Sequence, residues 1–323
     1  MEIISQIALF ILGMVLIIYG GDAFVDAALC IGRKIGISTF VLGATVVSLT
    51  TTLPELFVST IASAGGHTEL AIGNAVGSII CNTGLILGLC AVLTPMVLNG
   101  PSQVKKALLS IGCLLALAAL TLSGSITWVG GLGLYLLLAV YLWLNFREMK
   151  QAPARTENTE ESFSAKHIAL FIVGAGSIIL GSNILVDSAS ALATLMHIPE
   201  KFIALSVVAL GTSLPELVTS LTAIRKKEAG LSIGNIIGAN ILNIVLVMAT
   251  SAIVAPGGLT TTVVKSGILQ GMDQLLVLDI PVAAVLAGIL LFCARKKSVP
   301  RMAGIVLLAV YAGYLGFTGY AIL

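Results

Sequence analysis

The chain has 323 residues, of which 58% are hydrophobic and only 10% are charged, and its mean hydropathy is +1.08. This composition excludes an ordinary soluble domain, in which about a quarter of the residues are charged. The net charge is +2, and the basic residues stand at the ends of apolar stretches rather than in one patch. No nucleic acid partner is therefore expected, and the lipid bilayer is the expected surroundings.

Ten mainly apolar stretches are each long enough, at about 20 residues, to cross a bilayer. They lie near residues 3–21, 37–63, 69–94, 105–122, 126–146, 166–189, 201–224, 229–255, 274–294 and 302–321. With both termini outside the cell, these spans put every Lys and Arg except Lys201 and Lys265 on the cytoplasmic side, as membrane proteins prefer. The sequence thus predicts an all-α, multi-pass protein of the plasma or inner membrane.

Residues 46–85 repeat as residues 207–246, at a constant offset of 161, with 18 identities in 40 pairs. Each half of the chain has five spans, an odd number, so the second half is predicted to enter the membrane from the opposite side. The predicted organisation is a first repeat at 1–146 with its motif at 43–92, a cytoplasmic linker at 147–166, and a second repeat at 167–323 with its motif at 204–253. Inverted repeats are a recurring plan of secondary transporters, which bind their substrate near the midplane.

Two glutamates, Glu55 and Glu216, carry the strongest local signal. Each follows a proline in the middle of an apolar span, and the two correspond at the repeat offset. A charge at the bilayer centre costs at least about 2.5–3.5 kcal/mol, so such residues are retained for function. The prolines interrupt helical hydrogen bonding one turn earlier and free carbonyl oxygens there. The sequence therefore predicts one shared intramembrane cation site.

Mostly polar residues at helical spacing share a face with each glutamate, and residues at steps of four in the following spans face the same seam. They are Ser48, Thr51, Thr52 and Ser59 beside Glu55, Ala209, Thr212, Ser213 and Ser220 beside Glu216, and, in the following spans, Asn74, Ser78 and Asn82 with their counterparts Asn235, Ala239 and Asn243. Hydroxyl, amide, carbonyl and carboxylate oxygens are ligands for Ca2+ or Na+, whereas a soft metal would need buried His or paired Cys. A single Ser or Thr can instead bond to its own helix, but a doubled pattern favours a site.

Other polar or small residues have simpler interpretations. Asp22, Asp26 and Asp187 lie nearer the ends of spans, where a cap or a wet interface is expected, and Asp279 is expected near the outer boundary. Four glycines at spacing four, in two pairs, are expected to let helices approach closely: Gly73, Gly77, Gly234 and Gly238. The five cysteines are isolated, and no resident cofactor is expected.

The motifs TTTLPEL and GTSLPEL, followed by GNAVGSIICN and GNIIGANILN, resemble those of the calcium/cation antiporter superfamily, in its prokaryotic sodium/calcium exchanger branch. The resemblance covers nearly the whole chain. It implies ten helices, a core formed by spans two, three, seven and eight, and first and sixth spans that slide across this core. It also implies a set of cation ligands: Glu55, Glu216, Ser48, Thr51, Thr52, Ser78, Asn82, Ala209, Thr212, Ser213 and Asn243.

Three residues depart from the family pattern. Thr50 replaces a glycine, Ala239 replaces a serine and so removes a hydroxyl, and Asn243 stands where some relatives have aspartate. Only two formal negative charges then remain in the predicted site, so the number of coupled Na+ ions stays open.

The expected function is secondary active exchange of Ca2+ for Na+ by alternating access, and not an enzymatic reaction. The charge of two carboxylates is balanced by one Ca2+, two Na+ or two protons, so a proton-coupled antiporter is an alternative. Transport of another divalent ion, such as Mg2+ or Mn2+, is also an alternative. A passive cation channel is a further alternative. An intramembrane aspartyl protease is disfavoured because both motif acids are glutamates. No obligatory protein partner is evident.

Overall fold

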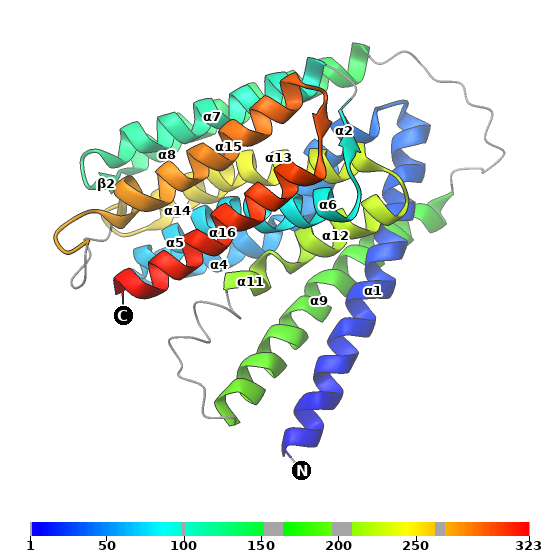
Figure 1. Cartoon of the computed structure of the whole chain (residues 1–323), viewed down its shortest axis with the longest axis horizontal. Coiled ribbons are helices and arrows are strands. Elements are labelled where there is room, and N and C mark those ends of the chain that lie inside the picture. The colour runs from blue at the N-terminus through cyan, green and yellow to red at the C-terminus, as the bar shows by residue number, and fades with distance from the viewer. Residues whose placement is uncertain (1, 99–100, 152–163, 196–208, 262–268, 323) are drawn as a thin grey trace. The chain divides into compact units, whose positions relative to one another are not determined.

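The computed structural model describes residues 2–98, 101–151, 164–195, 209–261 and 269–322, which are mainly helical (Figure 1). The first half contains α1 (Glu2–Ile35), α2 (Thr39–Leu42), η1 (Gly43–Val47), α3 (Ser48–Thr51), α4 (Leu53–Ala64), α5 (Thr68–Ile80), η2 (Cys81–Leu87), α6 (Gly88–Leu93), β1 (Met96–Val97), α7 (Pro101–Thr121), β2 (Ser125–Ile126) and α8 (Trp128–Gln151). The second half contains α9 (Ala165–Leu195), α11 (Ala209–Thr212), α12 (Leu214–Arg225), α13 (Ala229–Leu242), η4 (Asn243–Met248), α14 (Ala249–Val254), β3 (Leu259–Thr260), η5 (Leu275–Asp279), α15 (Ile280–Arg295), β4 (Ser298–Val299) and α16 (Arg301–Ile322). The η elements are π-helical stretches within longer helices.

Within these described ranges, eight helices are long and apolar enough to cross a membrane, and an interrupted helix formed by residues 39–51 and 53–64 makes a ninth. These nine agree with nine of the ten predicted spans. The tenth, 201–224, lies partly outside the described residues, and its described part is α11 and α12. Large apolar side chains such as Tyr19 and Leu136 are 72% exposed, as expected for a surface that faces lipid.

The described helices form two compact units. The first unit comprises Met1–Pro54 and Asn145–Asn235, and the second comprises Glu55–Leu144 and Ile236–Leu323. Each unit therefore takes segments from both halves of the chain, and the unit boundaries fall within α4, α8 and α13. The two glutamates divide between the units, with Glu216 in the first and Glu55 in the second.

In the first unit, α1 and α9 lie side by side and touch through their backbones (Figure 1). A Cβ on Gly13 would lie 2.9 Å from the carbonyl oxygen of Gly181, and a Cβ on Gly174 would lie 2.9 Å from that of Gly20. Only glycine permits this approach. At the repeat offset, Gly13 corresponds to Gly174 and Gly20 corresponds to Gly181. Gly13 therefore packs against the counterpart of Gly20, and Gly20 packs against the counterpart of Gly13, as two antiparallel helices allow.

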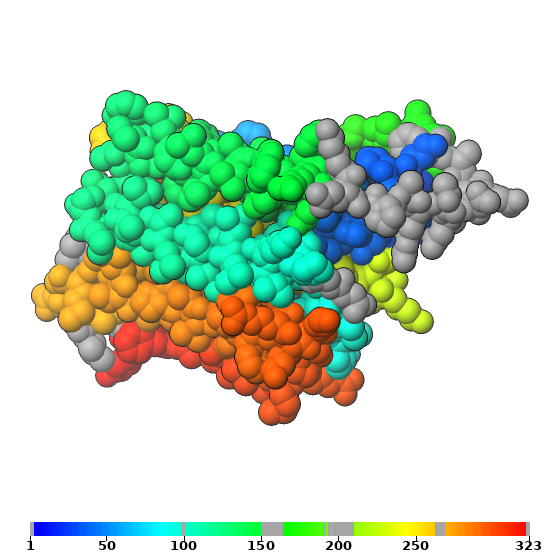
Figure 2. All heavy atoms as spheres, turned by 90° about the horizontal axis from the view of Figure 1, so that it is seen from above, coloured from blue at the N-terminus to red at the C-terminus, as the bar shows by residue number. Residues whose placement is uncertain are grey.

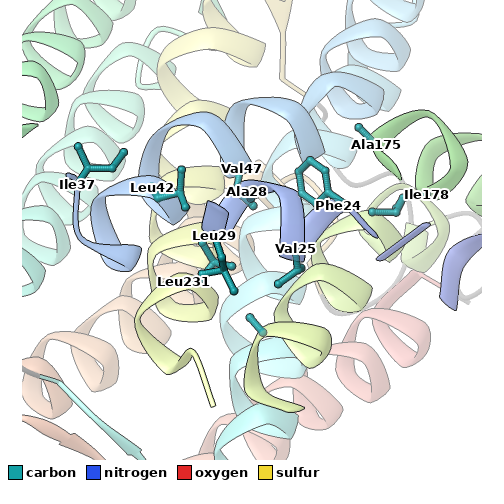
Figure 3. Packing of buried hydrophobic residues seen from close by; sticks show 11 residues of the cluster. Phe24, Val25, Ala28, Leu29, Ile37, Leu42, Val47, Ala175, Ile178 and Leu231 are labelled. Atoms are coloured by element: carbon teal, nitrogen blue, oxygen red, sulfur yellow. The ribbon is translucent and has the colours of Figure 1, made fainter. Parts of the chain in front are cut away.

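A buried apolar cluster joins these two helices to the segments that lead to the first motif (Figure 3). From α1 it contains Phe24, Val25, Ala28 and Leu29, and from α9 it contains Ala175 and Ile178. Its other members are Ile37, Leu42, Val47, Ala223 and Leu231. The ring of Phe24 also lies 4.6 Å, centroid to centroid, from that of Phe171. The cluster thereby fixes the backbone that carries Ser48, Thr51 and Thr52.

The second unit packs α16 against α6 and η2, and α15 against α7 and α16. Figure 2 shows α7 and α15 running next to each other over one face of this unit. A Cβ on Gly84 would lie 2.8 Å from the Tyr311 side chain, so this glycine admits α16. Two short antiparallel strand pairs, β1 with β4 and β2 with β3, tie the helix ends together.

The repeat seen in the sequence recurs in the secondary structure. The bounds of α3, α4 and α6, moved by 161 residues, are the bounds of α11, α12 and α14. The stretch η2 likewise corresponds to η4, which begins one residue later than the offset gives. Such π-helical stretches are rare and often mark functional positions, and here Asn82 and Asn243 lie at the start of each.

Candidate functional site

The helix that carries each glutamate begins after a break in the chain's helical path. The first break is at Thr52, between α3 and α4, and the second is at Ser213, between α11 and α12. Pro54 and Pro215 are the second residues of α4 and α12 and cannot donate to a carbonyl one turn earlier. The predicted interruptions are therefore confirmed, and they leave polar backbone next to Glu55 and Glu216.

In the first unit, Glu216 is completely buried among hydroxyl groups. Its carboxylate faces the side chains of Thr51 and Thr52, which are 2% and 1% exposed, and Ser213 beside it is also buried. Neither carboxylate oxygen has a partner with hydrogen-bond geometry among the described residues. A buried, unsatisfied carboxylate is costly unless a cation accompanies it, so this arrangement suits a cation.

An asparagine on the next helix touches this group. The hydroxyl of Thr51 donates to Oδ1 of Asn235 at 3.2 Å. The amide Nδ2 of Asn235 donates in turn to Oγ of Ser220, at 3.5 Å, and Ser220 lies one turn after Glu216. Asn235 and Ser220 are both completely buried. A polar chain thus runs from the first motif to the glutamate helix of the second.

In the second unit, Glu55 has a comparable environment. The hydroxyl of Ser78 donates to Oε1 of Glu55 at 3.5 Å. Asn74, the counterpart of Asn235, donates through Nδ2 to the backbone carbonyl of Glu55 at 3.3 Å and to Oγ of Ser59 at 2.9 Å. Glu55 and Ser59 are completely buried. The sequence-based prediction that Ser59 shares a helix face with Glu55, and that Asn74 and Ser78 of the next span face the same seam, agrees with these contacts.

Two further amides of the second unit, Asn82 and Asn243, are completely buried. In both, neither the side-chain oxygen nor the nitrogen has a hydrogen-bond partner among the residues that the structure covers. Leaving a buried polar group unsatisfied costs about 1–3 kcal/mol. Two such amides at equivalent repeat positions therefore fit an environment in which their oxygens bind a ligand.

The remaining predicted residues are less closely defined. Ser48 is buried, Thr212 is half-buried and its hydroxyl lacks a described partner, and Ala209 lies in α11.

The close approach expected of the glycines is confirmed at Gly234, where a Cβ would lie 2.2 Å from a backbone oxygen. It is wrong for Gly73 and Gly77, because a Cβ there would meet no described atom within 4 Å.

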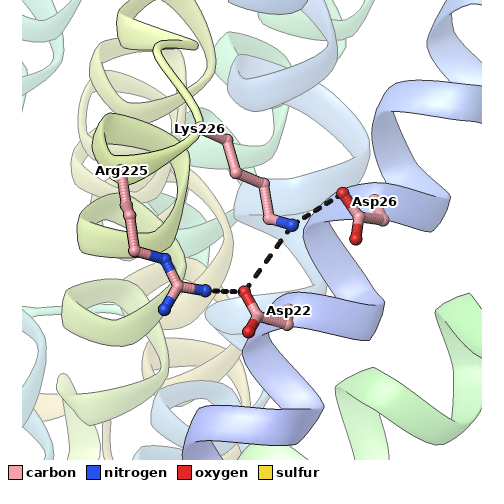
Figure 4. A network of polar contacts seen from close by, with 4 residues as sticks. All are labelled: Asp22, Asp26, Arg225 and Lys226. Atoms are coloured by element: carbon pink, nitrogen blue, oxygen red, sulfur yellow. Dashed lines mark hydrogen bonds and ion pairs between the residues drawn. The ribbon is translucent and has the colours of Figure 1, made fainter.

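Sequence reasoning missed an ion-pair cluster between α1 and the end of α12 (Figure 4). Lys226 Nζ lies 2.7 Å from Oδ1 of Asp26 and 3.6 Å from Oδ1 of Asp22, and Arg225 pairs with Asp22. The hydrogen bond to Asp22 raises the pKa of the exposed Arg225 guanidinium, which therefore stays charged. About 200 residues separate the partners, and no local pattern reveals such a pairing.

Two other buried polar contacts were also not predicted. Asn240 donates to the Thr83 hydroxyl at 2.7 Å, and Asp279 accepts from the Tyr314 hydroxyl at 3.0 Å while being only 8% exposed. Groups of three or more His, Cys, Asp or Glu able to hold a metal ion are not found within the described ranges.

Apolar helices long enough to cross a membrane, with a helix break next to a buried glutamate in each of two repeated motifs, are typical of a polytopic membrane transporter. The family model described as sodium/calcium exchanger protein matches residues 5–147 and 166–320. The chain belongs to this family of cation antiporters, as its motifs indicated.

Relatives and solved structures agree with this membership. The chain is 32% identical to an uncharacterized membrane protein of Methanocaldococcus jannaschii, over 96% of both chains. It is 28% identical to the sodium/calcium exchanger MaX1 of Methanosarcina acetivorans, over 95% of this chain and 96% of the relative. A structure of the sodium-calcium exchanger NCX_Mj soaked with 2.5 mM Na+ and 10 mM Sr2+ has a TM-score of 0.84 and 31% identity, covering 97% of this chain and 99% of that one.

Proposed function

We propose that this protein exchanges Ca2+ for Na+ across the cell membrane, with Glu55 and Glu216 as the principal ligands of one midplane cation site. The observation that carries this proposal is that each glutamate is completely buried in an apolar helix beside hydroxyl and amide groups. Membership of the sodium/calcium exchanger family supports the choice of ions. The solved structures of the similar exchanger NCX_Mj include ones soaked with Na+ alone, with Na+ and Ca2+, and with Na+ and Sr2+.

The proposed ligand set consists of oxygen atoms. Beside the two glutamates it includes Ser48, Thr51, Thr52, Ser78, Asn82, Ala209, Thr212, Ser213 and Asn243, with Ala209 contributing only its backbone carbonyl. Ca2+ takes six to eight oxygen ligands in flexible geometry. Such a mixture of carboxylate, hydroxyl, amide and carbonyl oxygens suits it better than it suits a soft metal.

Charge balance explains why such a site would exchange ions rather than leak them. Two carboxylates carry a charge of −2, which one Ca2+ or two Na+ neutralise. Occluding the empty site would leave like charges in a low dielectric, at a cost of several kcal/mol per uncompensated ion. The change between inward and outward access is then fast only when cations are bound, which is the requirement for coupled exchange.

The departures at Ala239 and Asn243 bear on stoichiometry. Ala239 is buried in α13 and offers no side-chain oxygen, while Asn243 is neutral. The site then has two formal negative charges, those of Glu55 and Glu216, and it lacks one hydroxyl that the family pattern has. We therefore expect this chain to couple fewer Na+ ions to each Ca2+ than a relative with the full family pattern.

The topology is part of the proposal. Two inverted repeats, 1–146 and 167–323, joined by the cytoplasmic linker 147–166 and with both termini outside, account for the distribution of basic residues. The antiparallel contacts of α1 with α9, in which Gly13 meets Gly181 and Gly20 meets Gly174, are the contacts expected between helices related by inversion.

The proposal is tested by uptake of radioactive Ca2+ into proteoliposomes under separate gradients. Uptake driven by an outward Na+ gradient, and absent without a counter-cation, is the expected result. Uptake driven only by a pH gradient would instead establish the proton-coupled alternative. Rapid flux with no exchange partner would reject antiport in favour of a channel.

A further inference from the structure

Asn235 is held rigidly at the place where the two motifs of the first unit meet. A Cβ on Gly43 would lie 2.3 Å from the carbonyl oxygen of Leu231 and 2.8 Å from the backbone nitrogen of Asn235, and a Cβ on Gly234 would lie 2.2 Å from the carbonyl oxygen of Phe40. The backbones of α2 and η1 are therefore in direct contact with the turn of α13 that ends at Asn235. Since η1 leads into α3, this contact also sets the position of Thr51.

The hydroxyl of Thr51 has one proton and two lone pairs. To bind a cation, the oxygen must turn a lone pair toward the ion and give its proton to an acceptor elsewhere. Oδ1 of Asn235 accepts at 3.2 Å, and the carbonyl oxygen of Ser48 in the same helix lies at 3.4 Å. The Glu216 carboxylate, which Thr51 also faces, is a third acceptor, but a cation bound there would repel the hydroxyl proton. The amide nitrogen of Asn235 donates to Ser220, which fixes which end of the amide faces Thr51.

We propose that Asn235 is a positioning residue for the cation site. By accepting a hydrogen bond from the Thr51 hydroxyl, it turns the lone pairs of the Thr51 oxygen toward the Glu216 carboxylate and any ion bound there. Asn235 acts through Thr51 and does not itself bind the ion. This role rests on the proposed function, because it assumes that Thr51 is a cation ligand.

The other half of the chain repeats one part of this arrangement. Asn74 donates to Ser59 at 2.9 Å, as Asn235 donates to Ser220, and each serine lies one turn after its glutamate. Asn74 donates also to the backbone carbonyl of Glu55. An asparagine that anchors the glutamate helix is thus built twice, in two units of the fold, which is not expected of an incidental contact.

The test compares Asn235→Leu, Thr51→Val and the double variant, in full-length protein in proteoliposomes, by the Ca2+ concentration that half-saturates exchange. Asn235→Leu, which has a similar shape but no acceptor, should raise this concentration about tenfold, equivalent to about 1.4 kcal/mol. Thr51→Val should do the same. The double variant should be no worse than Thr51→Val alone, because no hydroxyl is left to position.

Two further variants separate positioning from stability. Asn235→Asp keeps the acceptor, so its half-saturating concentration should not rise. Thr250→Val is the matched control, since it removes a 2.8 Å contact with Tyr135 that involves none of the proposed cation ligands. It should lower the melting temperature without changing half-saturation. If Asn235→Leu does not fold, Ser220→Ala, which frees the amide to rotate, should raise half-saturation about threefold.

Three results would overturn the inference. The first is a half-saturating Ca2+ concentration within twofold of wild type in Asn235→Leu, or in Ser220→Ala where that variant replaces it. The second is a double variant whose fold-increase in this concentration is the product of the two single increases, as independent sites give, and the third is an increase in Asn235→Asp as large as in Asn235→Leu. These results presuppose a wild-type protein that exchanges cations. A wild type without exchange would instead reject the proposed function, and the role of Asn235 with it.

Discussion

Replacing Glu216 by glutamine should have opposite effects on cation binding and on the stability of the cation-free protein. The Glu216 carboxylate is completely buried, and neither of its oxygens has a described hydrogen-bond partner. When the carboxyl is ionised and no cation is bound, its charge is uncompensated, so a neutral amide of the same shape should relieve the protein of part of its burial cost. With a cation, the same replacement removes half of the negative charge proposed for the site.

The magnitudes follow from burial. Removing one partner of a buried ion pair costs about 3–5 kcal/mol, so Glu216→Gln should weaken Ca2+ binding by at least about a hundredfold. The cation-free variant should be more stable than the cation-free wild type by about 1–3 kcal/mol, the usual cost of an unsatisfied buried polar group. At a Ca2+ concentration of 100 times the wild-type Kd, the wild type gains about 2.7 kcal/mol, whereas a variant bound a hundredfold more weakly gains about 0.4 kcal/mol.

Thermal unfolding of purified protein, with and without Ca2+, measures both effects in one experiment. Glu69→Gln is the matched control, because Glu69 is an exposed residue in the first turn of α5 and should keep the wild-type response to Ca2+. A Glu216→Gln variant that is stabilised by Ca2+ as strongly as wild type would refute the reasoning. So would a cation-free variant less stable than the wild type, since Glu216 would then be satisfied within the protein.

Three further predictions follow from the contacts. Gly234→Ala should destabilise the protein by about 1–3 kcal/mol by overpacking, whereas Gly73→Ala, at an open position, should change the melting temperature little; equal effects would contradict the packing. Asp26→Asn should cost at most about 1 kcal/mol, because the Asp26 side chain is 64% exposed and its pair with Lys226 is screened by salt, so the difference in melting temperature should vanish at about 1 M salt. Asn243→Asp adds a carboxylate and should change the Na+ or pH dependence of exchange, measured as half-saturation at several pH values; an unchanged profile would place Asn243 away from the ion.

The sequence was sufficient for the features that depend on local chemistry. Apolar length predicted the spans, because a bilayer leaves little choice for 20 apolar residues. Pro54 and Pro215 predicted the helix breaks, because a proline cannot donate a backbone hydrogen bond. The repeat offset predicted that Asn74 and Asn235 would lie on corresponding faces, and both do contact the serine after their glutamate.

Features that depend on contacts between distant segments could not be predicted in the same way. The hydrogen bond from Asn240 to Thr83 has no counterpart in the repeat, since the corresponding residues are Ile79 and Ile244. Reasoning from repeated positions passes over such a pair. The open surroundings of Gly73 were missed for a related reason, because glycine spacing shows where helices can approach and not whether a neighbour is present.

The ion-pair cluster shows how a repeated scaffold becomes unequal in its two halves. Asp26 has a counterpart in Asp187, but the residues that correspond to Arg225 and Lys226 are Ala64 and Gly65, which carry no charge. The paired glycines of α1 and α9 contact each other symmetrically, whereas among the described residues the ion pairs join α1 to the end of α12. The backbone elements around both motifs recur at one offset, so the halves differ in unrepeated side chains such as these and in how closely equivalent glycines such as Gly234 and Gly73 are packed.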